Sequence, residues 1–162
     1  MKRSRFILGL ALTLLLTIAT TPSQCKYHSK NQIARANRTT DKSATPFGSL
    51  YAFDDLLREG PEPNSTVVGN GKGLYLSASQ DPANFTLVMY ADFGFTTGKF
   101  KGSSFGVFSR NPVAELPERE MAVVGGRGKF RLARGFVRVK THYFNAIMGD
   151  NIVKYKATLI HY

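Results

Sequence analysis

The feature that most constrains the fold is the alternation of side chains over residues 85–95. One set of alternating positions is apolar throughout: Phe85, Leu87, Met89, Ala91, Phe93 and Phe95. Successive strand residues point to opposite faces of a sheet, so this pattern predicts a β-strand with one buried face. The other face carries Val88 and Tyr90 as well as Asp92. Large side chains on both faces favour a ligand-binding barrel over a simple sandwich, with one face in the lumen and the other against a neighbouring subunit.

Short apolar or alternating runs recur after Pro46, and glycine or proline punctuates the joins between them. There are seven such runs, including residues 85–95, and they cover residues 48–53, 73–78, 85–95, 99–109, 121–124, 129–141 and 152–161. No helical period continues over a dozen residues. The sequence therefore predicts an all-β fold, an antiparallel β-barrel of seven strands.

Residues 121–135 read MAVVGGRGKFRLARG, which joins an apolar run to an alternating one through three glycines. The apolar half suits a buried strand. Gly125 and Gly126 supply either a turn with positive φ or a close backbone approach. We therefore predict a β-hairpin corner at the paired glycines. A phosphate-binding loop is excluded by the spacing and by the absence of a helical pattern afterwards.

The N-terminus has the layout of a secretory signal peptide. Lys2, Arg3 and Arg5 precede an apolar stretch over residues 6–19, which is short for a membrane span. Small residues before Lys26 predict cleavage after Cys25. The expected organisation is a signal peptide over residues 1–25, a flexible segment over 26–45 and one barrel domain over 46–162.

Export would remove the single cysteine, so we expect no disulfide in the mature chain. Three N-x-Ser/Thr sequons, at Asn37, Asn64 and Asn84, agree with secretion. The net charge is +11, and removal of three cations with the signal leaves +8. Because a secreted protein rarely meets nucleic acid, the charge favours retention on acidic cell-wall polysaccharide; a merely solvated basic surface is the equal alternative.

Few residues offer catalytic chemistry. The three histidines lack metal-ligand spacing, and no nucleophile motif is present, so we expect neither a metal nor a cofactor. Asp54 and Asp55 are interpreted as solvated turn carboxylates. Asp92 is a candidate proton donor if it faces the lumen, where desolvation would raise its pKa. Arg119 is a candidate ligand for an anionic or phenolic oxygen, or else forms a rim salt bridge with a neighbouring glutamate.

Several ordered segments resemble the plant dirigent family from about residue 33 to the end. They read SATPFGSLYAFDD (43–55), EGPEPNSTVVGNGKGLYLSASQ (59–80), FTTGKFKGSS (95–104), RNP (110–112), REMAVVGGRGKFRLARG (119–135) and VKYKATLIHY (153–162). The resemblance implies an eight-stranded antiparallel barrel, a homo-oligomer (dimer or trimer), and secretion to the apoplast.

The resemblance also implies a function without oxidation by the protein itself. A separate oxidase makes phenoxyl radicals from a monolignol such as coniferyl alcohol, and the dirigent pocket sets the face on which they couple in lignan and phenylpropanoid biosynthesis. Radical coupling needs orientation rather than a nucleophile. Two alternatives remain: an enzyme of isoflavonoid (pterocarpan-type) cyclisation or dehydration through a quinone methide, and a cell-wall binding module without turnover.

The resemblance extends to individual residues. Tyr75 and Arg119 match pocket positions of the family, and Asn111 replaces an aspartate of the lignan-forming members, which places the chain in the non-lignan branch. An amide is no acid, so Asn111 cannot protonate a quinone methide. The expected substrate pocket comprises Tyr75, Tyr90, Asn111, Arg119 and Arg134. The candidate groups of the alternative enzyme are Asp92, Arg119 and Tyr75.

Two departures from the family pattern stand out. A first strand resembling FYFHDI is missing before residues 33–37, and Leu56 replaces a proline. A barrel without one strand exposes two unpaired edges, which invites aggregation and opens the lumen. We therefore expect compromised activity in a seven-stranded barrel.

Overall fold

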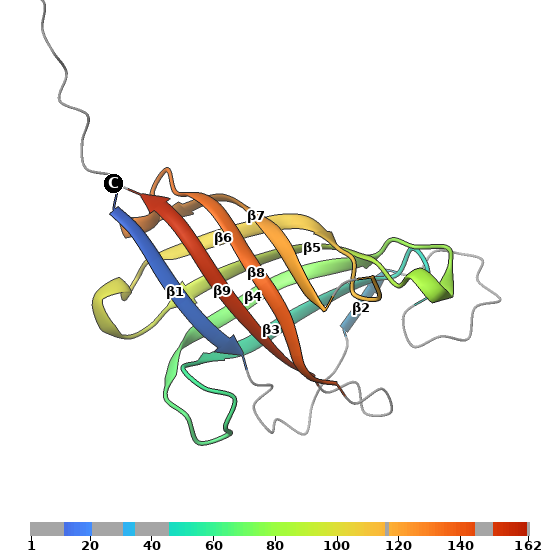
Figure 1. Ribbon diagram of the computed structural model, residues 1–162, viewed down its shortest axis with the longest axis horizontal. Helices are drawn as coiled ribbons and strands as arrows, with labels where there is room; N and C mark the ends of the chain where they lie inside the picture. The colour runs from blue at the N-terminus through green and yellow to red at the C-terminus, as the bar shows by residue number, and fades with distance from the viewer. Residues whose placement is uncertain (1–11, 21–30, 35–45, 116, 145–150, 162) are drawn as a thin grey trace, which may run out of the picture.

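The computed structural model describes residues 12–20, 31–34, 46–115, 117–144 and 151–161, the first two ranges by their backbone only. Its strands form one antiparallel sheet of order β1-β9-β8-β7-β6-β5-β4-β3-β2. The sheet curls into a barrel (Figure 1). The strands are β1 (Leu12–Thr20), β2 (Asn31–Ala34), β3 (Leu50–Arg58), β4 (Val67–Ser77), β5 (Leu87–Phe95), β6 (Ser104–Asn111), β7 (Glu118–Arg127), β8 (Arg134–Phe144) and β9 (Asn151–His161).

The seven strands predicted after Pro46 are confirmed as β3 to β9, and the all-β antiparallel fold is confirmed with them. Three short 3₁₀ turns connect some of them: η1 (Pro82–Asn84), η2 (Gly98–Phe100) and η3 (Gly128–Phe130). Part of the segment expected to be flexible is ordered, because β2 pairs with the start of β3. Among the described residues, no helix is long and apolar enough to cross a membrane.

The strand that closes the barrel comes from the stretch predicted as an export signal. β1 pairs with β9 along all nine of its residues, and Ala19 and Thr20 also pair with Arg58 and Leu57 of β3. Figure 1 shows β1 lying alongside β9. β1 thus covers an edge of β9 that the loss of a first strand would leave unpaired. Cleavage after Cys25 stays a prediction, and Cys25 lies outside the described residues.

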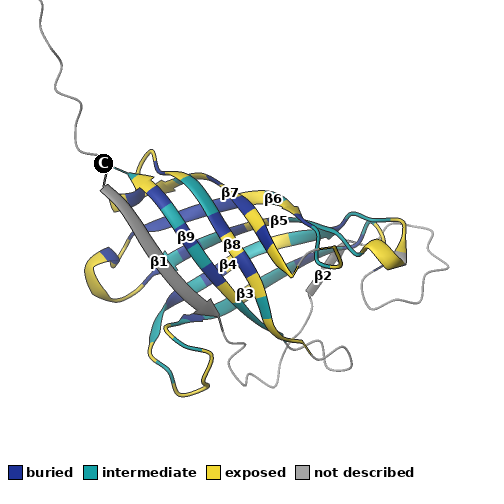
Figure 2. Cartoon of the chain, in the orientation of Figure 1, coloured by how far each residue is buried: buried dark blue, intermediate teal, exposed yellow. Residues whose placement is uncertain are grey.

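Alternation separates the two faces in the middle of these strands (Figure 2). Buried residues alternate with exposed ones over residues 118–124 of β7 and 137–140 of β8, and with partly buried ones over residues 155–159 of β9. The apolar set predicted in β5 is buried from Met89 onward, with Met89, Ala91, Phe93 and Phe95 all at most 7% exposed. These side chains form the inner face, and together with Val137, Ala157 and Leu159 they build one continuous core.

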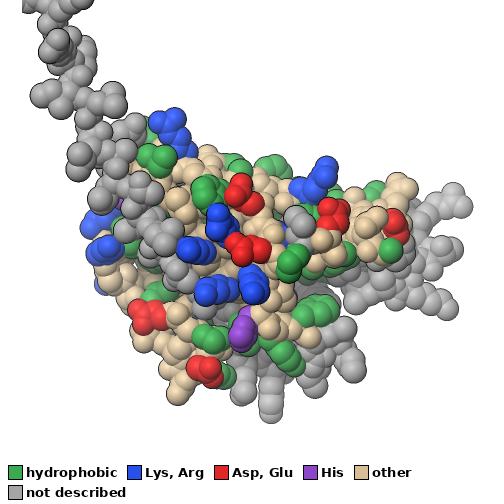
Figure 3. Space-filling view, viewed as in Figure 1, with side chains coloured by type: hydrophobic (Ala, Val, Ile, Leu, Met, Phe, Trp, Pro, Cys, Tyr) green, Lys and Arg blue, Asp and Glu red, His purple; other side chains and the backbone are tan. Residues whose placement is uncertain are grey.

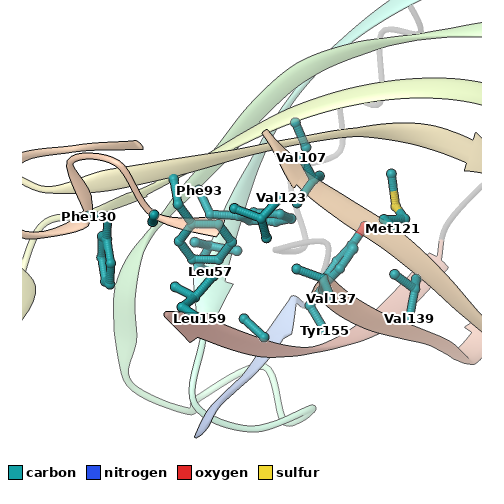
Figure 4. Close-up of a cluster of buried hydrophobic side chains, with 14 of the residues drawn as sticks. Leu57, Phe93, Val107, Met121, Val123, Phe130, Val137, Val139, Tyr155 and Leu159 are labelled. Carbon is teal, nitrogen blue, oxygen red and sulfur yellow. The ribbon is translucent and has the colours of Figure 1, made fainter. Parts of the chain in front are cut away.

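Phenylalanines fill one end of the barrel. We call Phe95, Phe100, Phe105 and Phe130 the aromatic plug. Phe100 and Phe130 end the turns η2 and η3, which both read Gly-Lys-Phe, and their ring centroids lie 4.8 Å apart. The other pairs within the plug that involve Phe130 lie at 5.6 and 5.7 Å. Figure 4 shows Phe130 at one end of the core cluster and Met121 with Val139 at the other. Aromatic pairs at such distances stabilise beyond their buried area.

The hairpin corner lies beyond the paired glycines, so its predicted position is wrong by a few residues. Gly125 and Gly126 belong to β7, where the register with β6 shifts, and the chain reverses at η3. Gly125 has φ +152, and a Cβ on Gly126 would lie 2.6 Å from the Phe130 carbonyl oxygen. The glycines therefore permit a bulge and a close approach that seats the plug.

We predict that removal of residues 1–25 lowers the thermal unfolding midpoint and promotes self-association. Without β1, the edge of β9 presents unpaired backbone groups along most of its length. The measurement is scanning calorimetry with analytical ultracentrifugation on the full chain and on a chain starting at Lys26. The control starts at Leu12 and keeps β1. The role of β1 would be contradicted if the chain starting at Lys26 were monomeric and had the same thermal unfolding midpoint as the control.

Candidate functional site

Away from the plug, polar groups and aromatic rings share the inner face of the sheet. We call Tyr51, Tyr75, Asn111, Arg119 and Tyr155 the inner cluster. They come from five strands, β3, β4, β6, β7 and β9, and alternation turns each of them inward. The inner cluster includes three of the residues that the sequence predicted for a pocket, Tyr75, Asn111 and Arg119, which share the inner face of the sheet.

Tyrosine rings provide the apolar surface of the inner cluster. The rings of Tyr51 and Tyr75 are stacked, with centroids 5.0 Å apart and planes 18° apart, and Phe53 lies 6.4 Å from Tyr75. Tyr75 and Phe53 are inward-facing but only partly buried, whereas Phe105 and Phe130 in the plug are at most 1% exposed. Tyr75 and Phe53 are therefore the rings of this region that keep contact with solvent, whereas Tyr51, Asn111, Arg119 and Tyr155 are at most 8% exposed. An aromatic ligand entering there meets ring faces on which it can stack.

Arg119 is a buried cation on this face, with only 4% of its surface exposed. It donates a hydrogen bond from Nη2 to Thr141 Oγ1 at 2.9 Å, while its Nε atom has no partner among the described residues. Burial lowers the pKa of Arg119, and the neighbouring Tyr155 opposes that shift. The rim salt bridge considered for Arg119 is absent from the described residues, because Arg119 faces inward while Glu118 and Glu120 face outward, where Glu118 pairs with Arg138.

Asn111 supplies a neutral amide on the same inner face. Its Nδ2 atom lies 3.9 Å from Met89 Sδ, and its buried Oδ1 atom has no hydrogen-bond partner among the described residues. Leaving a buried polar atom unpaired costs about 1–3 kcal/mol, so each such atom calls for an explanation. The free Asn111 Oδ1 acceptor and the free Arg119 Nε donor are both suited to a phenolic or alcoholic hydroxyl.

Sequence reasoning missed Asp55, which it treated as a solvated turn residue with Asp54. The pair lies inside β3, so the two carboxylates point to opposite faces. Asp54 is exposed and pairs with Lys72 at 3.0 Å. Asp55 is half-buried, and its charge helps to raise the pKa of Tyr75 and of Tyr155, after the larger effect of burial. The alternation from Tyr51 to Leu57 was the signal that could have revealed it.

Three other sequence candidates lie outside the barrel. Asp92 and Tyr90 alternate with the buried Ala91 and Phe93, so they face outward and the condition for a lumenal Asp92 is not met. Asp92 accepts a hydrogen bond from Ser104 Oγ at 3.1 Å and lines an open outer groove with Tyr90 and Arg127. Arg134 is exposed on β8.

The remaining expectations concern modification and metals. Of the three sequons, Asn64 and Asn84 are exposed, and Asn37 lies outside the described residues. His161 packs edge-on against Phe130 and His142 is exposed, while His28 lies outside the described residues. In the part of the chain that the structure describes, no group of three His, Cys, Asp or Glu side chains could hold a metal ion.

We predict that Tyr75 makes the fold sensitive to alkali. Burial, followed by the charges of Tyr51 and Asp55, raises its pKa from 10.0 to about 12. From pH 10 to 12 the unfolded chain loses this proton first, so the free energy of unfolding falls as pH rises. Chemical denaturation across this range should show a shallower fall for Tyr75→Phe than for the unaltered protein. The control is Tyr143→Phe at an exposed ring, which should leave the decrease in unfolding free energy with pH unchanged. The same decrease in all three proteins would contradict the role given to Tyr75.

Comparison with known proteins places this barrel in a family. Residues 18–160 match the family model described as Dirigent-like protein. Dirigent protein 15 of Arabidopsis thaliana is 57% identical over 134 residues, covering 81% of this chain and 70% of that protein. Pterocarpan synthase 1 of Glycine max is 43% identical over 121 residues, and this match covers 75% of the present chain but only 64% of the synthase.

The similarity extends to three-dimensional structure. The solved pterocarpan synthase dirigent protein GePTS1 superposes with a TM-score of 0.82 at 32% sequence identity. That match covers 97% of this chain and 89% of the other. Sequence and fold agree, and the chain belongs to the dirigent family.

Proposed function

We propose that the chain directs the coupling of phenoxyl radicals and that the inner cluster holds the phenolic substrates. The single observation that carries this proposal is the arrangement of a buried cation and two stacked tyrosines, one of them only partly buried, on the inner face of the sheet. Membership of the dirigent family and the resemblance to dirigent motifs support it. The radicals come from a separate one-electron oxidase, and the chain itself transfers no electron.

The chemistry asked of the inner cluster is modest. Two radicals form a carbon–carbon bond without a nucleophile, so selectivity depends on which faces meet. The Arg119 guanidinium can hold a phenolic or methoxyl oxygen while Tyr51 and Tyr75 contact the ring. A preference of about 1.4 kcal/mol for one approach gives roughly tenfold selectivity. One charge-assisted hydrogen bond is of that size.

We predict that Arg119→Gln abolishes most of the enantiomeric excess while the total yield of coupled product stays the same. The oxidant still makes radicals, but their orientation loses its anchor. The measurement is chiral chromatography of the products formed from coniferyl alcohol with a one-electron oxidant and purified protein. Tyr75→Phe, which keeps the ring, serves as a second variant should Arg119→Gln fold poorly; we expect a smaller loss of excess.

The matched control is Arg138→Gln, which makes the same change on the outer face of the neighbouring strand β8. We expect it to direct coupling as the unaltered protein does. Equal excess for the Arg119→Gln and Arg138→Gln variants, with both folded, would refute the inner cluster as the substrate site. Racemic product from the unaltered, folded protein would refute radical guidance for this substrate.

Asp55 favours a second candidate function, an acid–base reaction on an isoflavonoid alcohol. Its carboxylate faces inward beside Tyr75 and Tyr155, so the inner face holds a group that can accept or donate a proton. Loss of water from such an alcohol through a quinone methide needs a proton delivered to the leaving hydroxyl and one taken from the phenol. The pterocarpan synthases among the relatives support this candidate.

We predict that, if this second function operates, Asp55→Asn lowers turnover of an isoflavanol by a hundredfold or more, the usual contribution of a general acid–base group being about 10²–10⁴. The assay contains no oxidant and follows product by chromatography. Asp54→Asn is the control, because that carboxylate lies on the outer face with Lys72. Product at equal rates from both variants would exclude Asp55. Absence of product from the unaltered protein would leave radical guidance as the function.

A further inference from the structure

Four cations face each other across two neighbouring strands on the outside of the barrel. Arg138 stands opposite Lys156, and Lys140 stands opposite Lys154, in the register of β8 with β9. All four alternate with the inward Val137, Val139, Tyr155 and Ala157, so they point outward. We call them the basic face. Figure 3 shows Lys and Arg side chains gathered over the middle of this side of the molecule.

This arrangement of cations lowers the stability of the fold when no partner is bound. Like charges directly opposite each other on antiparallel strands are destabilising, and here two such pairs are adjacent. Compensation on the same face is partial. Glu118 and Glu120 occupy the next strand, opposite Lys140 and Arg138, and the Glu118 carboxylate lies 3.7 Å from Arg138 Nε. Four cations therefore meet two carboxylates, and of the cations Arg138, Lys140 and Lys154 are exposed while Lys156 is partly buried.

We propose that the basic face binds a linear acidic polysaccharide of the polyuronate type, which supplies the missing carboxylates. A twisted sheet surface presents its cations in rows and suits an extended chain with regularly spaced charges. The predicted export and the two exposed sequons point to an extracellular partner. Arg138 lies over one face of the neighbouring Phe136 ring, with its guanidinium carbon 5.8 Å from the ring centroid, so it competes with a nucleic-acid base for stacking on that face.

The proposal is independent of the inner cluster and of its chemistry, since the two sets lie on opposite faces of the sheet. The Arg119→Gln variant is therefore expected to bind polysaccharide as the unaltered protein does. The probe is polygalacturonate, and fully methyl-esterified pectin provides a closely related backbone without the charge. Binding to polygalacturonate should weaken as salt rises and should be absent for the methyl ester.

The decisive variant replaces Arg138, Lys140, Lys154 and Lys156 by glutamine. Its matched control replaces four exposed cations at the plug end of the barrel, Lys99, Lys101, Lys129 and Arg131, so that both proteins lose the same net charge. We expect the first variant to bind polygalacturonate about tenfold more weakly or worse, and the control to bind nearly as well as the unaltered protein. Isothermal titration calorimetry at low salt measures both.

Two further measurements separate binding at this face from a general charge effect. Glu118→Gln with Glu120→Gln should bind polygalacturonate more tightly, because these carboxylates compete with the polymer. Without polymer, the Lys154→Gln/Lys156→Gln variant should unfold at a higher temperature than the unaltered protein at low salt, since the opposed cations are gone. Both effects should shrink in high salt.

The outcomes are distinguishable. Weakening by the basic-face variant and not by its control supports the proposal. Equal weakening by both, which net charge alone would cause, overturns it. Tighter binding of single-stranded DNA or of anionic lipid vesicles than of polygalacturonate, through the same four residues, also overturns the choice of a polysaccharide.

Discussion

The aromatic plug is the contact on which the rest of this barrel depends. Phe100 and Phe130 enter from two turns with the same Gly-Lys-Phe sequence, and they pack against Phe95 and Phe105 from β5 and β6. The plug removes large rings from water and ties both hairpins to the core. Gly126 makes this possible, because any side chain there would collide with Phe130. With one end filled by the plug, a ligand would have to reach the inner face past the partly buried Tyr75 and Phe53.

The alternation of side chains along each strand then decides which functional groups share a face of the sheet. A single step along β3 separates Asp54, paired with Lys72 outside, from Asp55, which acts on two tyrosines inside. A single step along β5 separates the buried Ala91 from the outward Asp92. The same rule places Arg119 inside and its two glutamate neighbours outside, beside the basic face. The same alternation therefore places the inner cluster on one face of the sheet and the basic face on the other.

The sequence was sufficient for the elements whose pattern is periodic. The apolar alternation of β5 and the resemblance to dirigent motifs predicted the sheet, its seven main strands and three members of the inner cluster. It misplaced Asp55 because β3 runs on through DDLLR, beyond the apolar stretch that marked it. The sequence misplaced the hairpin corner because a glycine that permits a close backbone approach cannot be told from a glycine that turns the chain by its identity alone. Strand pairing by residues 12–20 had no local signal, since an apolar stretch suits an export signal and a buried strand equally.

A crystal structure with a bound, unreactive methoxyphenol would show whether the inner cluster is the substrate site. We expect the phenol at the inner cluster, with its oxygen within hydrogen-bond distance of the Arg119 guanidinium and its ring against Tyr51 and Tyr75. Soaking the Arg119→Gln variant under the same conditions should leave that position empty. A phenol bound instead in the outer groove beside Tyr90, Asp92 and Arg127, with the inner face vacant, would contradict this expectation.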